Sequence, residues 1–202
     1  MNKIDFIEYV KEQIKPHNIK LYISNGNQVN CEGSRVQGYS CISSRVMAVA
    51  NGAKVDPQDM FEVLIHEYCH FEQWLEQSKS WVDSEDNLVN ESWYSILDGR
   101  IDWHKDFDYS LQIIINLELD CEKRVLRIID KFDLPVDKTL YAKKANSYLY
   151  FYSYLKECRS WYSNNNAPYK NEKIYNLLPS TLKSSYKKIP KDLLDEFRRH
   201  YE

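Results

Sequence analysis

The sequence is poor in glycine, with 5 glycines among 202 residues. Tight turns depend heavily on glycine, so this scarcity disfavours a chain of many short hairpins and favours helices. No apolar run approaches the length of a membrane span. The N-terminal stretch MNKIDFIEYVKEQIK also lacks the continuous apolar core of a signal peptide. We therefore expect a protein of the cytoplasm that has no membrane partner.

The sequence also lacks an excess of either charge. Its 27 basic and 30 acidic residues give a net charge of −3. Proteins that bind nucleic acids usually carry a basic surface, so we expect no nucleic-acid partner. The five cysteines are odd in number and include no CxxC pair. This pattern favours reduced thiols over a disulfide framework, again as expected for the cytoplasm.

What is present is a mainly helical pattern. Hydrophobic residues make up 43% of the chain, enough for a buried core. Apolar periodicity and capping residues predict helices at 3–15, 56–77, 91–104, 108–132 and 138–162, and strands at 19–24 and 43–50. Asn25-Gly26 predicts a hairpin, and the polar residues 78–90 predict a loop. The chain should fold as a predominantly helical α+β domain over residues 1–162, with a small β-sheet and a core of about four helices. Residues 163–202 would form an Asn-rich linker and a small helical cap.

The stretch VLIHEYCHFEQW, residues 63–74, places His66, Glu67 and His70 on an otherwise apolar helix. Residues four apart lie on nearly the same helical face, so the two imidazoles can direct nitrogens at one tetrahedral Zn²⁺. Glu67 lies about 100° round the helix, where it can reach a water bound to that ion. This HExxH pattern is typical of zinc metallopeptidases. The alternative interpretation is a core helix that happens to carry two histidines.

A second helix offers carboxylates for a third ligand. One of its faces repeats at steps of three and four, through Leu111, Ile114, Ile115, Glu118, Glu122, Val125 and Ile129. Because the face is otherwise apolar, Glu118 and Glu122 interrupt it, and a bare carboxylate in a core is costly. A zinc ion would compensate for their charge. Pairing with Arg124, Arg100 or another buried arginine is the structural alternative.

An HExxH helix followed by a helix with Glu-x-x-x-Asp/Glu resembles the gluzincin metallopeptidases. The resemblance implies that Glu118 binds zinc and that Glu122, in place of the usual Asp, hydrogen-bonds His66. The roles of the two carboxylates could also be exchanged.

Residues 35–130 further resemble small metallopeptidase-like proteins of tailed bacteriophages, and are more distantly similar to minimal gluzincins of the ImmA/IrrE and HtpX types. This resemblance implies a zincin-like fold and a location in a host cytoplasm or a virion. It also implies that the strand SSRVMAVA is an edge strand that binds extended peptide.

These patterns predict a hydrolase that cuts peptide bonds of a protein or peptide substrate through a zinc-activated water. Glu67 would act as the general base and return the proton to the leaving amine. Tyr148 and His104 are candidates for a donor to the oxyanion. Tyrosine stripes at helical spacing usually belong to a core, however, and Tyr148 shares its face with Tyr141 and Tyr152.

Two further interpretations concern the cysteines and the function. Cys69 and Cys121 point away from the expected ligand direction, so we expect both to be small buried hydrophobes.

The alternative function is a zinc-stabilised binding or structural protein without proteolysis. Such a protein would be a phage assembly factor or an inhibitor of a host protein.

Overall fold

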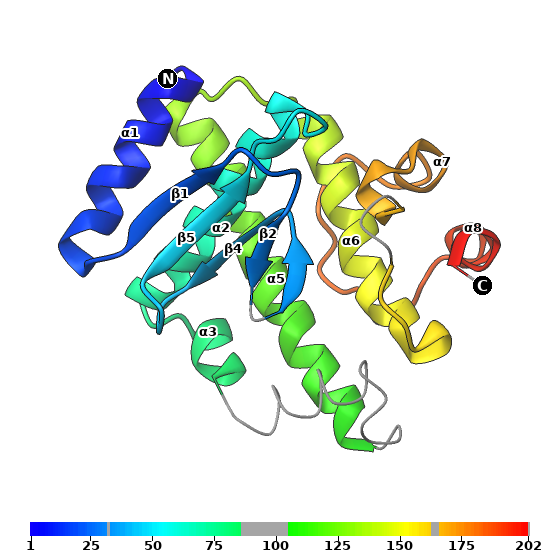
Figure 1. Cartoon of the computed structure of the whole chain (residues 1–202). Helices are drawn as coiled ribbons and strands as arrows, with labels where there is room; N and C mark the ends of the chain where they lie inside the picture. The colour runs from blue at the N-terminus through cyan, green and yellow to red at the C-terminus, as the bar shows by residue number, and fades with distance from the viewer. Residues whose placement is uncertain (32, 86–104, 163–165, 202) are drawn as a thin grey trace. The chain divides into compact units, whose positions relative to one another are not determined.

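The computed structural model describes residues 1–31, 33–85, 105–162 and 166–201 (Figure 1). The chain divides into two compact units, one of residues 1–77 and 124–136 and the other of residues 78–123 and 137–202. Helices predominate and the sheets are small, so the predicted α+β class is confirmed. Within the described ranges, no helix combines the length and the apolar character needed to cross a membrane.

The described part of the first unit contains a three-stranded sheet, a two-stranded hairpin and four helical segments. Its elements are α1 (Lys3–Ile14), η1 (Lys15–His17), β1 (Lys20–Ser24), β2 (Val29–Cys31), β3 (Ser34–Val36), β4 (Gly38–Cys41), β5 (Val46–Ala50), α2 (Pro57–Leu75) and the end of α5 (Lys105–Phe132). The sheet order is β1-β5-β4, with β5 parallel to β1 and antiparallel to β4.

This order corrects two predictions. The strand within SSRVMAVA, β5, is central, and β4 is the edge strand beside it. Asn25-Gly26 does not join a hairpin of consecutive strands, because β1 pairs in parallel with β5. In both cases a long-range backbone pairing overrides a local signal.

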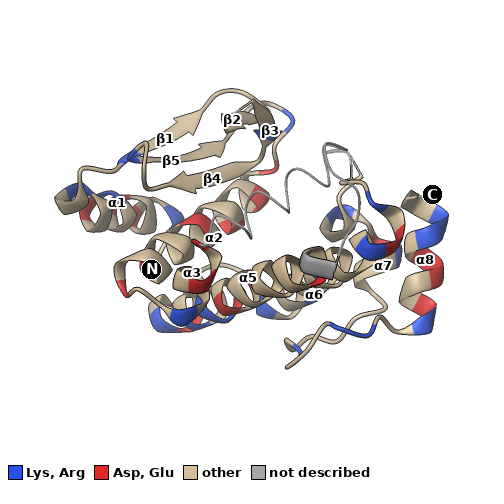
Figure 2. Ribbon diagram, turned by 90° about the horizontal axis from the view of Figure 1, so that it is seen from below, with Lys and Arg blue, Asp and Glu red and all other residues tan. Residues whose placement is uncertain are grey.

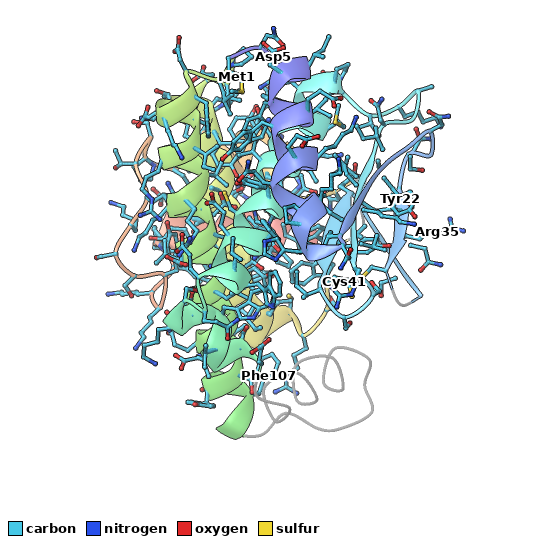
Figure 3. The ribbon with its side chains drawn as sticks, turned by 90° about the vertical axis from the view of Figure 1, so that its left-hand side faces the viewer. Met1, Asp5, Tyr22, Arg35, Cys41 and Phe107 are labelled. Carbon is cyan, nitrogen blue, oxygen red and sulfur yellow. The ribbon has the colours of Figure 1, made fainter. Side chains whose placement is uncertain are left out.

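Helices α1 and α2 cover one face of the sheet (Figure 2). Met47 and Val49 of β5 are fully buried, whereas Ala48 belongs with Val29 to a smaller hydrophobic cluster on the other face. This alternation is the period of two expected for a strand between two layers. On the side of the sheet away from α1, Tyr22 of β1 projects outward, and it is exposed (Figure 3). The sheet therefore buries its helix-covered face more completely than its other face.

The α2 helix confirms the sequence prediction closely. The Asp56 side chain caps it by accepting a hydrogen bond from the Gln58 N–H, and Pro57 occupies the first turn. Phe61, Leu64 and Ile65 are completely buried. The helix that carries HExxH is thus anchored along its apolar side.

The second unit is helical. Its elements are α3 (Lys79–Ser84), the part of α5 up to Lys123, α6 (Lys138–Cys158), η2 (Pro168–Lys170), α7 (Glu172–Tyr175) and α8 (Lys191–Tyr201). The helix α3 corrects the predicted loop at 78–90 over its own length. The predicted helix at 91–104 lies outside the described residues.

The predicted C-terminal cap is part of the core of this unit. Ile174 and Phe197 are fully buried in one cluster with Leu111 of α5 and Phe151 of α6. The unit boundary therefore does not fall at residue 162, where the sequence predicted a linker.

Candidate metal centre

The two histidines of α2 converge on one point. Their Nε2 atoms lie 3.1 Å apart, and their rings meet edge to face with centroids 4.7 Å apart. Two nitrogens at zinc–nitrogen distances of about 2.0–2.1 Å in a tetrahedral site would be roughly 3.3 Å apart. The separation of His66 and His70 is close to that value, so the pair fits a tetrahedral zinc ion without a change of helix geometry.

A buried glutamine orients one of these imidazoles. Oε1 of Gln73 lies 2.8 Å from Nδ1 of His70, and Gln73 has no exposed surface. When the amide oxygen accepts from Nδ1–H, the lone pair of the ring remains on Nε2, the atom that faces His66. A ligating histidine generally requires such a partner. The sequence prediction missed Gln73, whose only signal was a polar residue on the apolar helix three positions after His70.

Glu67 is buried beside the histidine pair and is 7% exposed. Burial raises the pKa of its carboxyl group to about 7, whereas the charge of His66 and the backbone N–H of Ser40 lower it. A carboxyl group with a pKa near neutrality can both accept and release a proton at physiological pH. The position and the burial of Glu67 therefore suit the predicted role of a general base.

The edge strand β4 lies directly against this part of α2. A Cβ added to Gly38 would clash with Cγ1 of Val63 and would lie 3.3 Å from Cγ of Glu67. The backbone N–H of Ser40 also donates a hydrogen bond to the Glu67 carboxylate. The edge strand β4 and Glu67, the predicted general base, are therefore in contact within the first unit.

The two acidic residues of α5 are buried within the second unit, where Glu118 is 8% exposed and Glu122 is 4% exposed. The Tyr141 hydroxyl of α6 donates to Oε2 of Glu122 at 2.7 Å. Glu118 raises the pKa of Tyr148, an effect secondary to burial of that phenol. The predicted core face of α5 is thus confirmed. The phenol groups of Tyr141 and Tyr148 form part of the environment of its two carboxylates. The role of Glu118 as a zinc ligand and the contact of Glu122 with His66 stay predictions.

The structural alternative was that a buried arginine pairs with Glu118 and Glu122, and Arg124 is the named arginine that the structure describes. Nη1 of Arg124 donates to Oε2 of Glu76 at 2.7 Å, within the first unit. Arg100 lies outside the described residues.

Of the two predicted donors to the oxyanion, the structure describes Tyr148. The hydroxyls of Tyr148 and Tyr152 lie 2.5 Å apart on α6, which supports the alternative that these tyrosines belong to the packing of the second unit. His104 lies outside the described residues.

The cysteines of the two motifs are both completely buried. Cys69 agrees with its prediction as a small hydrophobe. The prediction for Cys121 was too narrow, because His66, His70 and Cys121 are the described side chains that could together offer ligand atoms to one metal ion. A buried thiolate is a good ligand for zinc, so the direction expected from helix geometry was insufficient reason to set this cysteine aside.

Comparisons with known proteins identify no relative: no family description, no curated protein and no solved structure matches the chain.

Proposed function

We propose that the chain is a zinc-dependent metallopeptidase of the gluzincin type. The observation that carries the proposal is the convergence of the His66 and His70 Nε2 atoms at 3.1 Å, with Gln73 holding one ring.

In this proposal His66, His70 and Glu118 hold the ion. Zinc supplies Lewis acidity, which lowers the pKa of water and polarises a peptide carbonyl. Glu67 accepts a proton from the attacking water and passes it to the amine that leaves. The burial of Glu67 beside the histidine pair supports this assignment, since desolvation makes a carboxylate a better proton acceptor.

The substrate class we propose is an extended peptide or protein segment. An edge strand offers unpaired backbone groups to such a segment. The strand β4, which contacts Glu67 through Gly38 and Ser40, supplies that edge. The proposed location is the cytoplasm, or the host cytoplasm or virion if a bacteriophage encodes the protein.

Metal analysis of protein purified without a histidine tag tests the first part. We expect about one zinc per chain, and a loss of at least 90% of it in His66→Ala and in His70→Ala. His17→Ala is the control, because His17 packs against Phe71 and Trp74 on another part of the unit. Wild-type protein that neither contains zinc nor takes it up would refute the proposal.

Hydrolysis itself is tested by Glu67→Gln. We expect the variant to keep its zinc and to lose peptide cleavage by a factor of about 10²–10⁴, measured with a mixture of quenched fluorescent peptides. Glu62→Gln is the matched control, because Glu62 is also buried on α2 but accepts from Gln58. If Glu67→Gln binds zinc and retains the biological activity of the wild type, the zinc-stabilised binding protein replaces the peptidase.

A further inference from the structure

The hydroxyl group of Ser40 is buried and, among the described residues, has no hydrogen-bond partner. Serine is small and polar, and an unpaired buried hydroxyl is uncommon because it loses its hydration without compensation. A buried hydroxyl of this kind suggests a binding role, because a bound molecule would supply the missing hydrogen bond.

The register of β4 places the backbone of Ser40 at the open edge of the sheet. The Ala50 N–H donates to the Gln37 carbonyl at 2.8 Å, so Gln37 and Ala50 form a hydrogen-bonded pair. Pairs alternate along an antiparallel ladder, and the Ser40↔Met47 pair is therefore of the other kind, with backbone groups that point away from the partner strand. This outward N–H is the one that donates to the carboxylate of Glu67.

The side chain of Ser40 faces α2. Side chains two apart in a strand share a face, and a Cβ on Gly38 would point at Val63 and Glu67 of that helix. Ser40 therefore offers two groups on the Glu67 side: a backbone N–H, bonded to the carboxylate, and a buried hydroxyl that has no partner among the described residues.

We propose that Ser40 is a catalytic residue whose hydroxyl binds the water that Glu67 deprotonates. This inference rests on the proposed peptidase function. The Glu67 carboxylate accepts one hydrogen of the water and the Ser40 oxygen accepts the other, so that the oxygen lone pair is aimed at the peptide carbonyl carbon. The water O–H bond to Glu67 breaks as the C–O bond forms. The same proton then moves to the amine as the C–N bond breaks, and Ser40 gains and loses no atom.

Ser40→Ala tests this assignment with three readouts. Loss of one hydrogen bond to the reacting water should lower kcat about tenfold with little change in KM, measured on the quenched peptide mixture. The affinity of the Co²⁺-loaded protein for acetohydroxamate, followed by its visible spectrum, should fall by a similar factor. The thermal midpoint of the metal-free protein should stay unchanged or rise, because alanine removes a buried hydroxyl that has no partner in the described structure.

Two variants complete the test. Ser40→Thr keeps the hydroxyl and should restore most of the loss in kcat and in hydroxamate affinity. Ser44→Ala is the matched control, because Ser44 is exposed and its hydroxyl donates to the Cys41 carbonyl.

A drop of several degrees in the midpoint for Ser40→Ala would assign Ser40 a structural role and overturn the inference. Wild-type kcat and hydroxamate affinity in Ser40→Ala would also overturn it. Both results leave the peptidase proposal intact. The peptidase proposal fails if the wild-type protein binds zinc but cleaves no peptide.

Discussion

The amide oxygen of Gln73 lies 2.8 Å from Nδ1 of His70, and the Gln73 side chain is shielded from solvent, because Gln73 is completely buried. Because Gln73 is part of the core of the first unit, the packing of that core determines which nitrogen of the His70 ring is free to bind a metal. A histidine whose ring can rotate loses affinity for a metal, since the ordering must then occur on binding.

Gln73→Leu should therefore weaken zinc binding by a factor of about 10–100, with both histidines still in place. Competition with a chromogenic chelator measures this affinity. Gln77→Leu is the control, because Gln77 is exposed at the end of the helix and its side chain donates to the nearby Trp74 carbonyl. An equal affinity in Gln73→Leu and wild type would show that the contact with Gln73 does not orient a ligand.

The contact of β4 with α2 predicts an effect at a glycine. Gly38→Ala forces a methyl group against Val63, while the Ala48 carbonyl oxygen at 3.1 Å leaves no room to retreat. We expect a loss of about 1–3 kcal/mol in the free energy of unfolding, by overpacking. Urea titration of metal-free protein measures it.

The same clash can be relieved from the other side. Val63→Ala removes the obstructing methyl group, so the double variant should be more stable than the sum of the two single changes predicts. Strict additivity would contradict the close approach of β4 to the helix.

Much of this arrangement could be predicted from local sequence. Asp56, Pro57 and the apolar repeat determine α2, and the apolar face of α5 is confirmed by its fully buried Leu111 and Val125. Capping and periodicity are properties of a few neighbouring residues, which is why single-sequence reasoning finds them. The HExxH spacing belongs to the same class, since residues four apart in a helix meet without help from the rest of the chain.

The features that were missed depend on distant residues. The central place of β5 follows from the pairing of Lys20 with Val46 and of the residues after them, and no local pattern encodes that register. The short helix α3 forms in a polar stretch because Ser78 caps it through the Trp81 N–H. The backbone N–H of Ser40 likewise points away from β5 towards Glu67 only once β4 lies at the edge of the sheet.

The buried carboxylate of Glu122 gives a third prediction. Tyr141→Phe keeps the ring but removes the hydroxyl that donates to Oε2 at 2.7 Å. Loss of a donor to a buried carboxylate should cost about 1–3 kcal/mol in the free energy of unfolding. Tyr150→Phe is the matched control on the same helix, since Tyr150 packs against the ring of Tyr186 and should lose far less. Equal costs in the two variants would argue against a stabilising bond to Glu122.

The last prediction separates the two candidates for the third ligand on α5, Glu118 and Cys121. Cobalt bound by a thiolate shows an intense near-ultraviolet charge-transfer band, whereas cobalt bound by two imidazoles and a carboxylate does not. We expect the Co²⁺-loaded wild type to lack this band, because a carboxylate ligand is the one proposed for the peptidase.

Two substitutions complete that comparison. Glu118→Gln should lower zinc affinity by at least a factor of 100, because a neutral amide replaces an anionic ligand. Cys121→Ser should change the affinity less than threefold, as expected for a buried cysteine that acts only as a small hydrophobe. A thiolate band that disappears in Cys121→Ser, together with normal affinity in Glu118→Gln, would reverse the assignment. Zinc would then be held by His66, His70 and Cys121, whose ligand atoms lie close enough together among the described residues to hold one ion, and Glu118 would be a buried acid of the helical unit with no part in catalysis.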